Sequence, residues 1–105
     1  MAQYLDIGNI GTFLDEEFLE PLGLTHSALA KAIDVPPNRI TNIINGKTGI
    51  STDTDLRLCR YFNMSDGFFI RVQNRFDTVL KKRELGNILR AIKPHPVPHN
   101  FEARP

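Results

Sequence analysis

The chain has 105 residues, which is enough for one compact hydrophobic core but not for two independent domains. Hydrophobic residues make up 41% of the sequence, yet none of their runs is long enough for a membrane span or for the core of a signal peptide. The formal net charge is only +1, so any surface that binds nucleic acid has to be basic or polar locally. We therefore expect a single-domain, cytoplasmic protein without a membrane anchor.

Apolar residues recur at three- and four-residue spacings along most of the chain, which predicts helices and no strands. The first helix is expected to start at Thr12 as its N-cap, because Asp15 three residues later completes a capping box. Pro21 disfavours the helical conformation in the residue before it, so this helix is expected to end near Glu20. Its buried face would carry three apolar residues, Leu14, Phe18 and Leu22.

Two short helices joined by a tight turn are expected next. The first starts after Thr25 as its N-cap, and its core face would consist of Leu29, Ala30 and Ile33. Pro36 and Pro37 mark the turn, because proline is tolerated at a turn or at the first helical position but not inside a helix. The second runs from Pro37 to Ile44 and stops at Asn45-Gly46, where left-handed geometry is tolerated. Its buried side would consist of Ile40, Ile43 and Ile44.

The outward face of this third helix is rich in amides and hydroxyls. Its polar residues are Asn38, Arg39, Thr41, Asn42 and Asn45. Asn and Thr are mediocre helix formers, so a face enriched in them indicates directional hydrogen bonding to a partner. Two short helices with a tight turn and such a face are typical of a helix-turn-helix motif, here at about residues 25–45, whose second helix enters the DNA major groove.

Base reading on double-stranded DNA is therefore predicted for four residues of this helix. Arg can bond guanine O6 and N7 together, and Asn can bond adenine N6 and N7 together. The predicted base-reading residues are Asn38, Arg39, Thr41 and Asn42.

Residues at the two ends of the motif suit DNA phosphates. Thr25, His26 and Ser27 lie at the start of the second helix, where free backbone amides and the helix dipole favour an anion. For His26, an exposed residue of the capping turn is an equal alternative. Lys47 and Thr48 follow the third helix and could hold a neighbouring phosphate.

Two further helices complete an all-α chain of five helices. Ser51 or Thr52 is expected to cap the fourth, and Asp55 to complete a capping box with Thr52. Its inner face would consist of Leu56, Cys59 and Phe62. Ser65 is expected to cap the fifth, which runs to about Leu85 before Gly86 weakens it and one further turn follows. Its apolar stripe would consist of Phe69, Val72, Phe76 and Val79 or Leu80.

A proline-rich tail is predicted after the last helix, so that residues 1–92 form the DNA-binding domain and residues 93–105 are extended or disordered. His95 and His99 cannot share a helical face as a metal pair, because Pro96 and Pro98 exclude the helix. The sequence contains no glycine-rich phosphate loop and no Cys/His nucleophile pair. We therefore expect no cofactor, no metal and no enzymatic activity.

The chain closely resembles HigA-type antitoxins of the Cro/repressor-like helix-turn-helix class. The resemblance rests on Phe18-Leu19-Glu20-Pro21-Leu22-Gly23-Leu24, Ala28-Leu29-Ala30, Asn38-Arg39-Ile40, Asn45-Gly46-Lys47, Leu56-Arg57-Leu58 and Phe68-Phe69-Ile70-Arg71-Val72-Gln73. It implies a five-helix repressor-like fold and a homodimer on inverted-repeat operator DNA. It also implies repression of the chain's own operon and neutralisation of an RNA-cleaving HigB-type toxin.

Two alternatives remain open. The chain could be a stand-alone or phage-type repressor without a toxin, or a module that masks a toxin and keeps the helix-turn-helix only as a scaffold. A homodimer through the late helices is a hypothesis from geometry, since a protomer this small contacts one half-site and specificity usually needs two.

Overall fold

The computed structural model describes residues 8–97, which form five helices and no strand. The first helix is a continuous run of α2 (Ile10–Leu14), the π-helical segment η1 (Asp15–Leu19) and α3 (Glu20–Leu22). The other four helices are α4 (His26–Ala32), α5 (Pro37–Ile44), α6 (Thr52–Phe62) and α7 (Phe68–Ala91). This architecture confirms the predicted all-α fold of five helices. None of these helices combines the length and apolarity that a membrane crossing requires.

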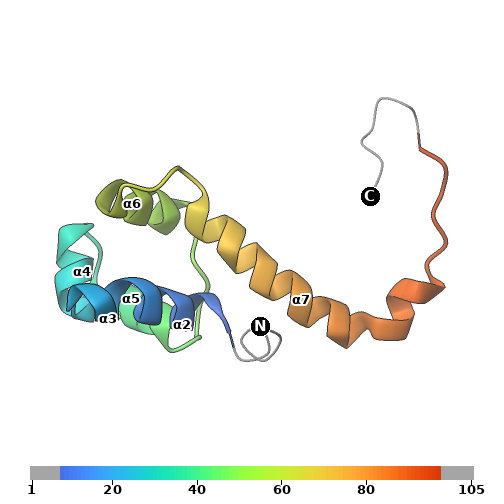
Figure 1. Ribbon diagram of the computed structural model, residues 1–105, viewed down its shortest axis with the longest axis horizontal. Coiled ribbons are helices and arrows are strands. Elements are labelled where there is room, and N and C mark those ends of the chain that lie inside the picture. Colours follow the sequence, from blue (N-terminus) through green and yellow to red (C-terminus); the bar gives the residue numbers. More distant parts are fainter. Residues whose placement is uncertain (1–7, 98–105) are drawn as a thin grey trace.

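The helices α2 to α6 form a compact body, and α7 starts on that body and extends away from it (Figure 1). Each of the five helices contributes a fully buried side chain to one core, namely Leu14, Leu29, Ile40, Leu58 and Phe69. Burying one such side chain contributes about 1.5–3 kcal/mol. The core therefore joins all five helices, including the first part of α7.

The first helix begins earlier and ends later than the sequence predicts. Asn9 is the N-cap, and its side chain accepts a hydrogen bond from the Thr12 amide at 2.9 Å, so the prediction of Thr12 as the cap is wrong. The chain remains helical through Pro21 by way of the π-helical turn. This wider turn shifts the helical phase, so Leu19 is buried and Leu22, predicted to be buried, is 61% exposed.

Gly11 allows α2 to pack closely on the end of α5. A Cβ atom at this position would lie 2.1 Å from the backbone oxygen of Ile43 and 2.8 Å from that of Ile44. Real Cβ atoms do not approach backbone oxygens this closely, so a larger residue would push the two helices apart. The first helix therefore supports the back of α5 through direct backbone contact.

The buried side of α6 differs from the predicted one because Asp55 points inward. Ser51 caps α6 by accepting from the Thr54 amide at 3.2 Å, and the predicted capping box of Thr52 with Asp55 does not form. Asp55 is 1% exposed. Leu56, the next residue along the helix, consequently turns outward and is 44% exposed, so its predicted place in the core is wrong.

Asp55 caps α7 from a different helix. Its carboxylate accepts hydrogen bonds from the backbone amides of Gly67 at 2.7 Å, Phe69 at 2.9 Å and Ile70 at 3.1 Å. The N-cap of α7 is Gly67, so the predicted cap by Ser65 is wrong; Ser65 instead accepts from Arg71. The carboxylate thus occupies the positive end of the longest helix, where an anion is most stabilising.

The second half of α7 bends at Gly86, which has φ 38° and ψ −110°, and one further turn follows. This confirms the predicted interruption and the turn after it. Residues 93–97 have no regular secondary structure. The rest of the predicted tail, His99 included, lies outside the described residues, and the division into residues 1–92 and 93–105 stays a prediction.

Replacing Asp55 with alanine should destabilise the fold by about 2–4 kcal/mol, because three backbone amides at the buried start of α7 lose their acceptor. Urea denaturation followed by circular dichroism measures the loss. Asp66→Ala removes an exposed carboxylate one residue before Gly67 and should change the stability by less than about 0.5 kcal/mol. Equal effects of the two substitutions would show that Asp55 does not act as a cap.

Candidate functional site

The α4 and α5 helices form the predicted motif. The hydroxyl of Thr25 accepts a hydrogen bond from the Ala28 amide at 3.0 Å, which confirms Thr25 as the N-cap of α4. Asp34 lies in the turn with φ 61°, a conformation that aspartate tolerates better than most residues. Helix α5 spans Pro37–Ile44 as predicted. The motif is therefore two short helices with one tight turn between them.

Helix α5 buries one side and exposes a polar one. Ile40 and Ile43 are buried, and Ile44 is half-buried against the same core. The four residues predicted to read bases divide into two exposed residues, Asn38 and Arg39, and two half-buried ones, Thr41 and Asn42. The outward side of α5 thus carries hydrogen-bonding groups, of which those at its N-terminal end are exposed.

The predicted phosphate-binding residues adjoin this polar side at both ends. The Thr41 hydroxyl lies 3.4 Å from His26 Nδ1, which joins the start of α4 to the middle of α5. The backbone amides of Lys47 and Thr48 both donate to the carbonyl of Asn42, at 2.9 and 3.4 Å. Thr25, Ser27, Lys47 and Thr48 are all exposed. The structure therefore joins His26, Lys47 and Thr48 directly to the α5 surface, while the individual contacts with DNA stay predictions.

The turn that carries Lys47 and Thr48 is held by α7 through Gln73, a residue that the sequence analysis missed. The side-chain amide of Gln73 donates to the carbonyl of Ile50 at 2.9 Å, and its oxygen accepts from the Ile50 amide at 2.6 Å. This pair of bonds pins the chain just after the turn. A glutamine on an amphipathic helix gives no sequence signal for such a role.

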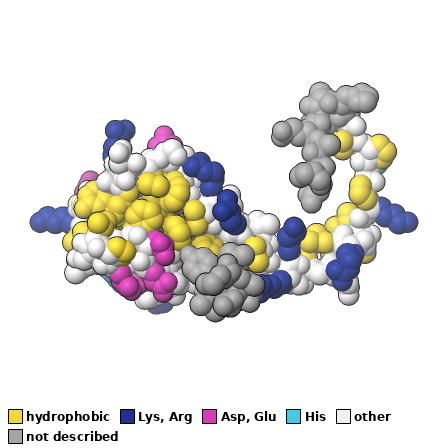
Figure 2. All heavy atoms as spheres, viewed as in Figure 1, with side chains coloured by type: hydrophobic (Ala, Val, Ile, Leu, Met, Phe, Trp, Pro, Cys, Tyr) yellow, Lys and Arg dark blue, Asp and Glu magenta, His cyan; other side chains and the backbone are white. Residues whose placement is uncertain are grey.

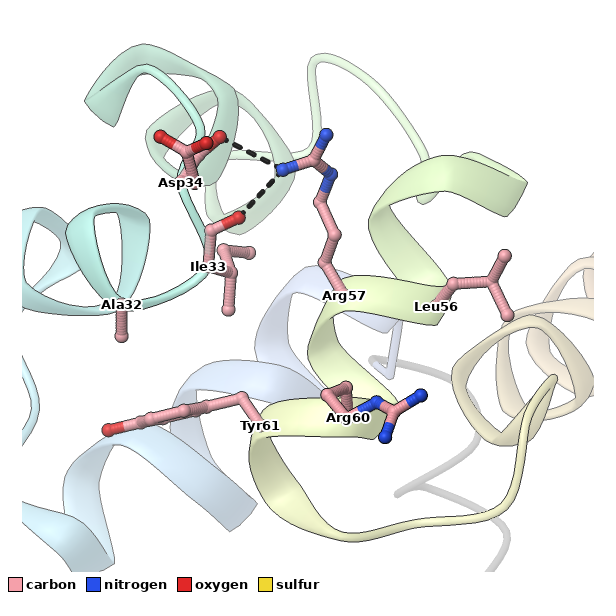
Figure 3. A pocket seen from close by; sticks show the side chains of 7 residues that line it. All are labelled: Ala32, Ile33, Asp34, Leu56, Arg57, Arg60 and Tyr61. Atoms are coloured by element: carbon pink, nitrogen blue, oxygen red, sulfur yellow. Dashed lines mark hydrogen bonds between the residues drawn. The ribbon is translucent and has the colours of Figure 1, made fainter.

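A second missed group connects α6 with the helix-turn-helix turn. Arg57 lines a pocket of about 620 Å³ and points from α6 to the backbone carbonyls of Ile33 and Asp34, to which it donates at 2.9 and 3.0 Å (Figure 3). The Nε atom of Arg57 also bonds to the carboxylate of Asp53 at 2.7 Å, and Arg39 Nη1 bonds to the same oxygen at 3.1 Å. The hydrogen bond from Arg57, aided by the charges of Arg57 and Arg39, holds the pKa of Asp53 below its usual value. Asp53 is therefore a carboxylate anion at neutral pH.

Comparisons with known proteins agree with this geometry. The helix-turn-helix family matches residues 16–69. Virulence-associated protein I of Dichelobacter nodosus is 40% identical over 78 residues, which are 74% of this chain and 72% of that protein. Antitoxin HigA-1 of Vibrio cholerae is 33% identical over 69 residues, which are 66% of this chain and 65% of that protein.

A solved structure extends the similarity over most of the chain. The structure of Pseudomonas aeruginosa antitoxin HigA with the higBA promoter has a TM-score of 0.76 at 30% identity, and it covers 83% of this chain and 96% of that one. The chain belongs to the helix-turn-helix family. One of these relatives and this structural neighbour are named HigA antitoxins, which confirms the resemblance inferred from the sequence.

Replacing Gln73 with methionine should loosen the Lys47–Thr48 turn, because it keeps the length of the side chain but removes both bonds to Ile50. We expect a loss of about 1–3 kcal/mol of stability, the cost of leaving two partly buried backbone groups unpaired. Hydrogen exchange measured by NMR should show a faster exchanging Ile50 amide. The control Asn74→Met alters the next, exposed residue of α7 and should leave the Ile50 amide protected. An Ile50 amide that stays equally protected in both variants would contradict the role of the Gln73 clamp, which is the pair of hydrogen bonds between Gln73 and Ile50.

Proposed function

We propose that this chain is a dimeric, operator-binding transcriptional repressor and the antitoxin of a HigBA-type module. The observation that carries the proposal is the polar side of α5, which is exposed at Asn38 and Arg39 and linked by hydrogen bonds to His26 and to the Lys47–Thr48 turn. The similarity to Pseudomonas aeruginosa antitoxin HigA, whose structure was solved with the higBA promoter, supports the proposal of operator binding. Because such DNA is chromosomal or plasmid-borne, the proposed site of action is the bacterial cytoplasm.

In this proposal α5 lies in the major groove, and different residues contact the DNA phosphates and the base edges. The start of α4 and the turn after α5 contact phosphates, which fix the register of the protein on the duplex. The base-reading residues of α5 then bond to base edges. No catalytic step is part of the proposed function.

A fluorescence-anisotropy titration tests this function. The purified chain is titrated with the DNA upstream of its own gene and with a scrambled duplex, each at two salt concentrations. Selective binding that weakens with salt supports a repressor, because phosphate contacts release counterions. Absence of selectivity at both salt concentrations would favour the toxin-masking module instead.

Two substitutions separate base reading from phosphate binding. Arg39→Ala should weaken operator binding by about 1–3 kcal/mol and relax the preference for operator over scrambled DNA, because a bidentate base contact is lost. Lys47→Ala should weaken binding to both duplexes similarly and reduce the salt slope by about 1. Equal losses on both duplexes for Arg39→Ala would contradict its role as a base reader.

The proposed dimer forms through the distal part of α7. This part projects from the body (Figure 1) and carries the exposed hydrophobic residues Leu80, Ile88 and Leu89, and exposed Ile92 follows as its C-cap. Figure 2 shows hydrophobic side chains along the distal part of the molecule, interspersed with Lys and Arg. A two-fold dimer would bury such residues and place two α5 helices on two half-sites.

Analytical ultracentrifugation tests the dimer. The wild-type chain should sediment as a dimer at micromolar concentration, and Ile88→Glu should shift it toward monomer because a buried charge opposes association. Asn74→Glu introduces the same charge on an exposed residue of α7 nearer the body and should leave the dimer intact. A wild-type chain that is monomeric both alone and with operator DNA would exclude the dimer.

Toxin neutralisation separates the remaining alternatives. A gene for a small RNA-cleaving protein beside this one, together with a stable complex of the two products, would support the antitoxin proposal. A chain that binds its operator without such a neighbour would instead be a stand-alone or phage-type repressor.

A further inference from the structure

We propose that Asp53 is a specificity-determining residue that positions the guanidinium of Arg39 for base reading. The proposal rests on the proposed function, because it assigns a new residue to the same DNA surface. Asp53 lies in the first turn of α6, outside the helix-turn-helix motif itself. Its role is to act through Arg39 and not to contact a base.

The contact joins two helices that are distant in sequence. Asp53 Oδ1 accepts from Arg39 Nη1 on α5 at 3.1 Å and from Arg57 Nε on α6 at 2.7 Å. The side chains of Arg39 and Asp53 are 41% and 58% exposed. An isolated pair at this exposure contributes little to folding stability. The consequence of the contact is therefore the direction in which Arg39 points.

Arg57 anchors the carboxylate from behind. Its Nη1 atom donates to the carbonyls of Ile33 and Asp34, so this guanidinium is fixed to the turn between α4 and α5 (Figure 3). Hydrogen bonds then run without interruption from the turn to Arg57, from Arg57 to Asp53, and from Asp53 to Arg39. A carboxylate held in this way gives Arg39 a fixed partner.

This arrangement occupies one nitrogen of Arg39 and leaves the others available. Among residues 8–97, the only bond from the Arg39 guanidinium is the one from Nη1 to Asp53. The Nε and Nη2 donors are parallel and form the side of the fork that matches O6 and N7 of guanine. Because Asp53 already orders the side chain, DNA binding costs less rotamer entropy.

The negative charge of Asp53 also opposes a sequence-independent contact between Arg39 and a DNA phosphate. A free arginine at a DNA surface can bind phosphate on any sequence. A carboxylate bonded to Arg39 neutralises much of that attraction and repels the phosphate backbone, and such repulsion against competing partners is a common source of specificity. Asp53 therefore favours selectivity over total affinity.

The test is a double-substitution cycle with operator and scrambled DNA. Asp53→Asn should lower the ratio of operator affinity to scrambled-DNA affinity by about tenfold, which is within the range of one bidentate base contact. The same substitution in an Arg39→Ala background should leave the ratio unchanged, because Asp53 then has no arginine to position. Asp53→Glu, which keeps the carboxylate, should recover part of the ratio.

Asp66→Asn is the matched control. It removes the same charge from an exposed residue between α6 and α7 that lies outside the network of Arg57, Asp53 and Arg39. This control should change the affinity for both duplexes alike and leave their ratio unchanged. Thermal melts of all variants confirm that the fold persists, as expected for substitutions at exposed side chains.

The outcomes distinguish this inference from the proposed function. A wild-type chain without selectivity overturns the proposed function and this inference with it. A selective wild-type chain whose ratio falls equally on Asp53→Asn with and without Arg39, or falls equally in the Asp66→Asn control, overturns the inference alone. Loss of the ratio only where Arg39 is present supports it.

Discussion

The start of α7 depends on the buried carboxylate of Asp55. Three backbone amides converge on it, and the helix has no capping side chain of its own. A buried charge is costly unless it is fully hydrogen-bonded, and here the amides and the helix dipole provide that compensation. Because Phe69 and Phe76 of α7 are buried in the body, the cap also fixes how these aromatic rings enter the core. Asp55 thus determines both where the longest helix begins and how it packs.

Helix α7 connects this core to the functional surface. One turn after Phe69, Gln73 holds Ile50 and with it the end of the Lys47–Thr48 turn. Beyond the body, the same helix carries the exposed apolar residues proposed to join two protomers. A repressor dimer must keep the α5 helices of its two protomers about one turn of DNA apart. A single helix that holds the turn proposed to contact DNA near one end, and carries the proposed dimer interface near the other, is a direct way to transmit that spacing.

The sequence predicts elements well where local chemistry decides them. Helix α5 was predicted with both bounds, because Pro37 starts it and Asn45-Gly46 ends it, and the Thr25 cap follows from one hydroxyl. The wrong predictions of capping and burial concern residues whose environment depends on parts of the chain that are distant in sequence. The sequence predicts Asp55 as a local capping residue of α6, whereas its carboxylate caps α7. It predicts Leu22 in the core, whereas the π-helical turn shifts the helical phase and leaves Leu22 exposed. The links from Asp53 to Arg39 and from Gln73 to Ile50 join residues 14 and 23 positions apart, and no local pattern encodes them.

The low net charge of the chain explains why the contacts from Asp53 to Arg39 and from Gln73 to Ile50 matter for DNA binding. A strongly basic protein gains most of its DNA affinity from counterion release on any sequence. A chain with a net charge of +1 gains less of that non-specific attraction than a strongly basic one, so we expect its selectivity to depend on directional bonds made by a few well-placed side chains. Directional bonds are sensitive to small displacements, since a hydrogen bond weakens steeply as its angle departs from linearity. The clamp on the turn after α5 and the ion-pair network behind Arg39 are the supports that such a surface requires, and both originate in helices outside the motif.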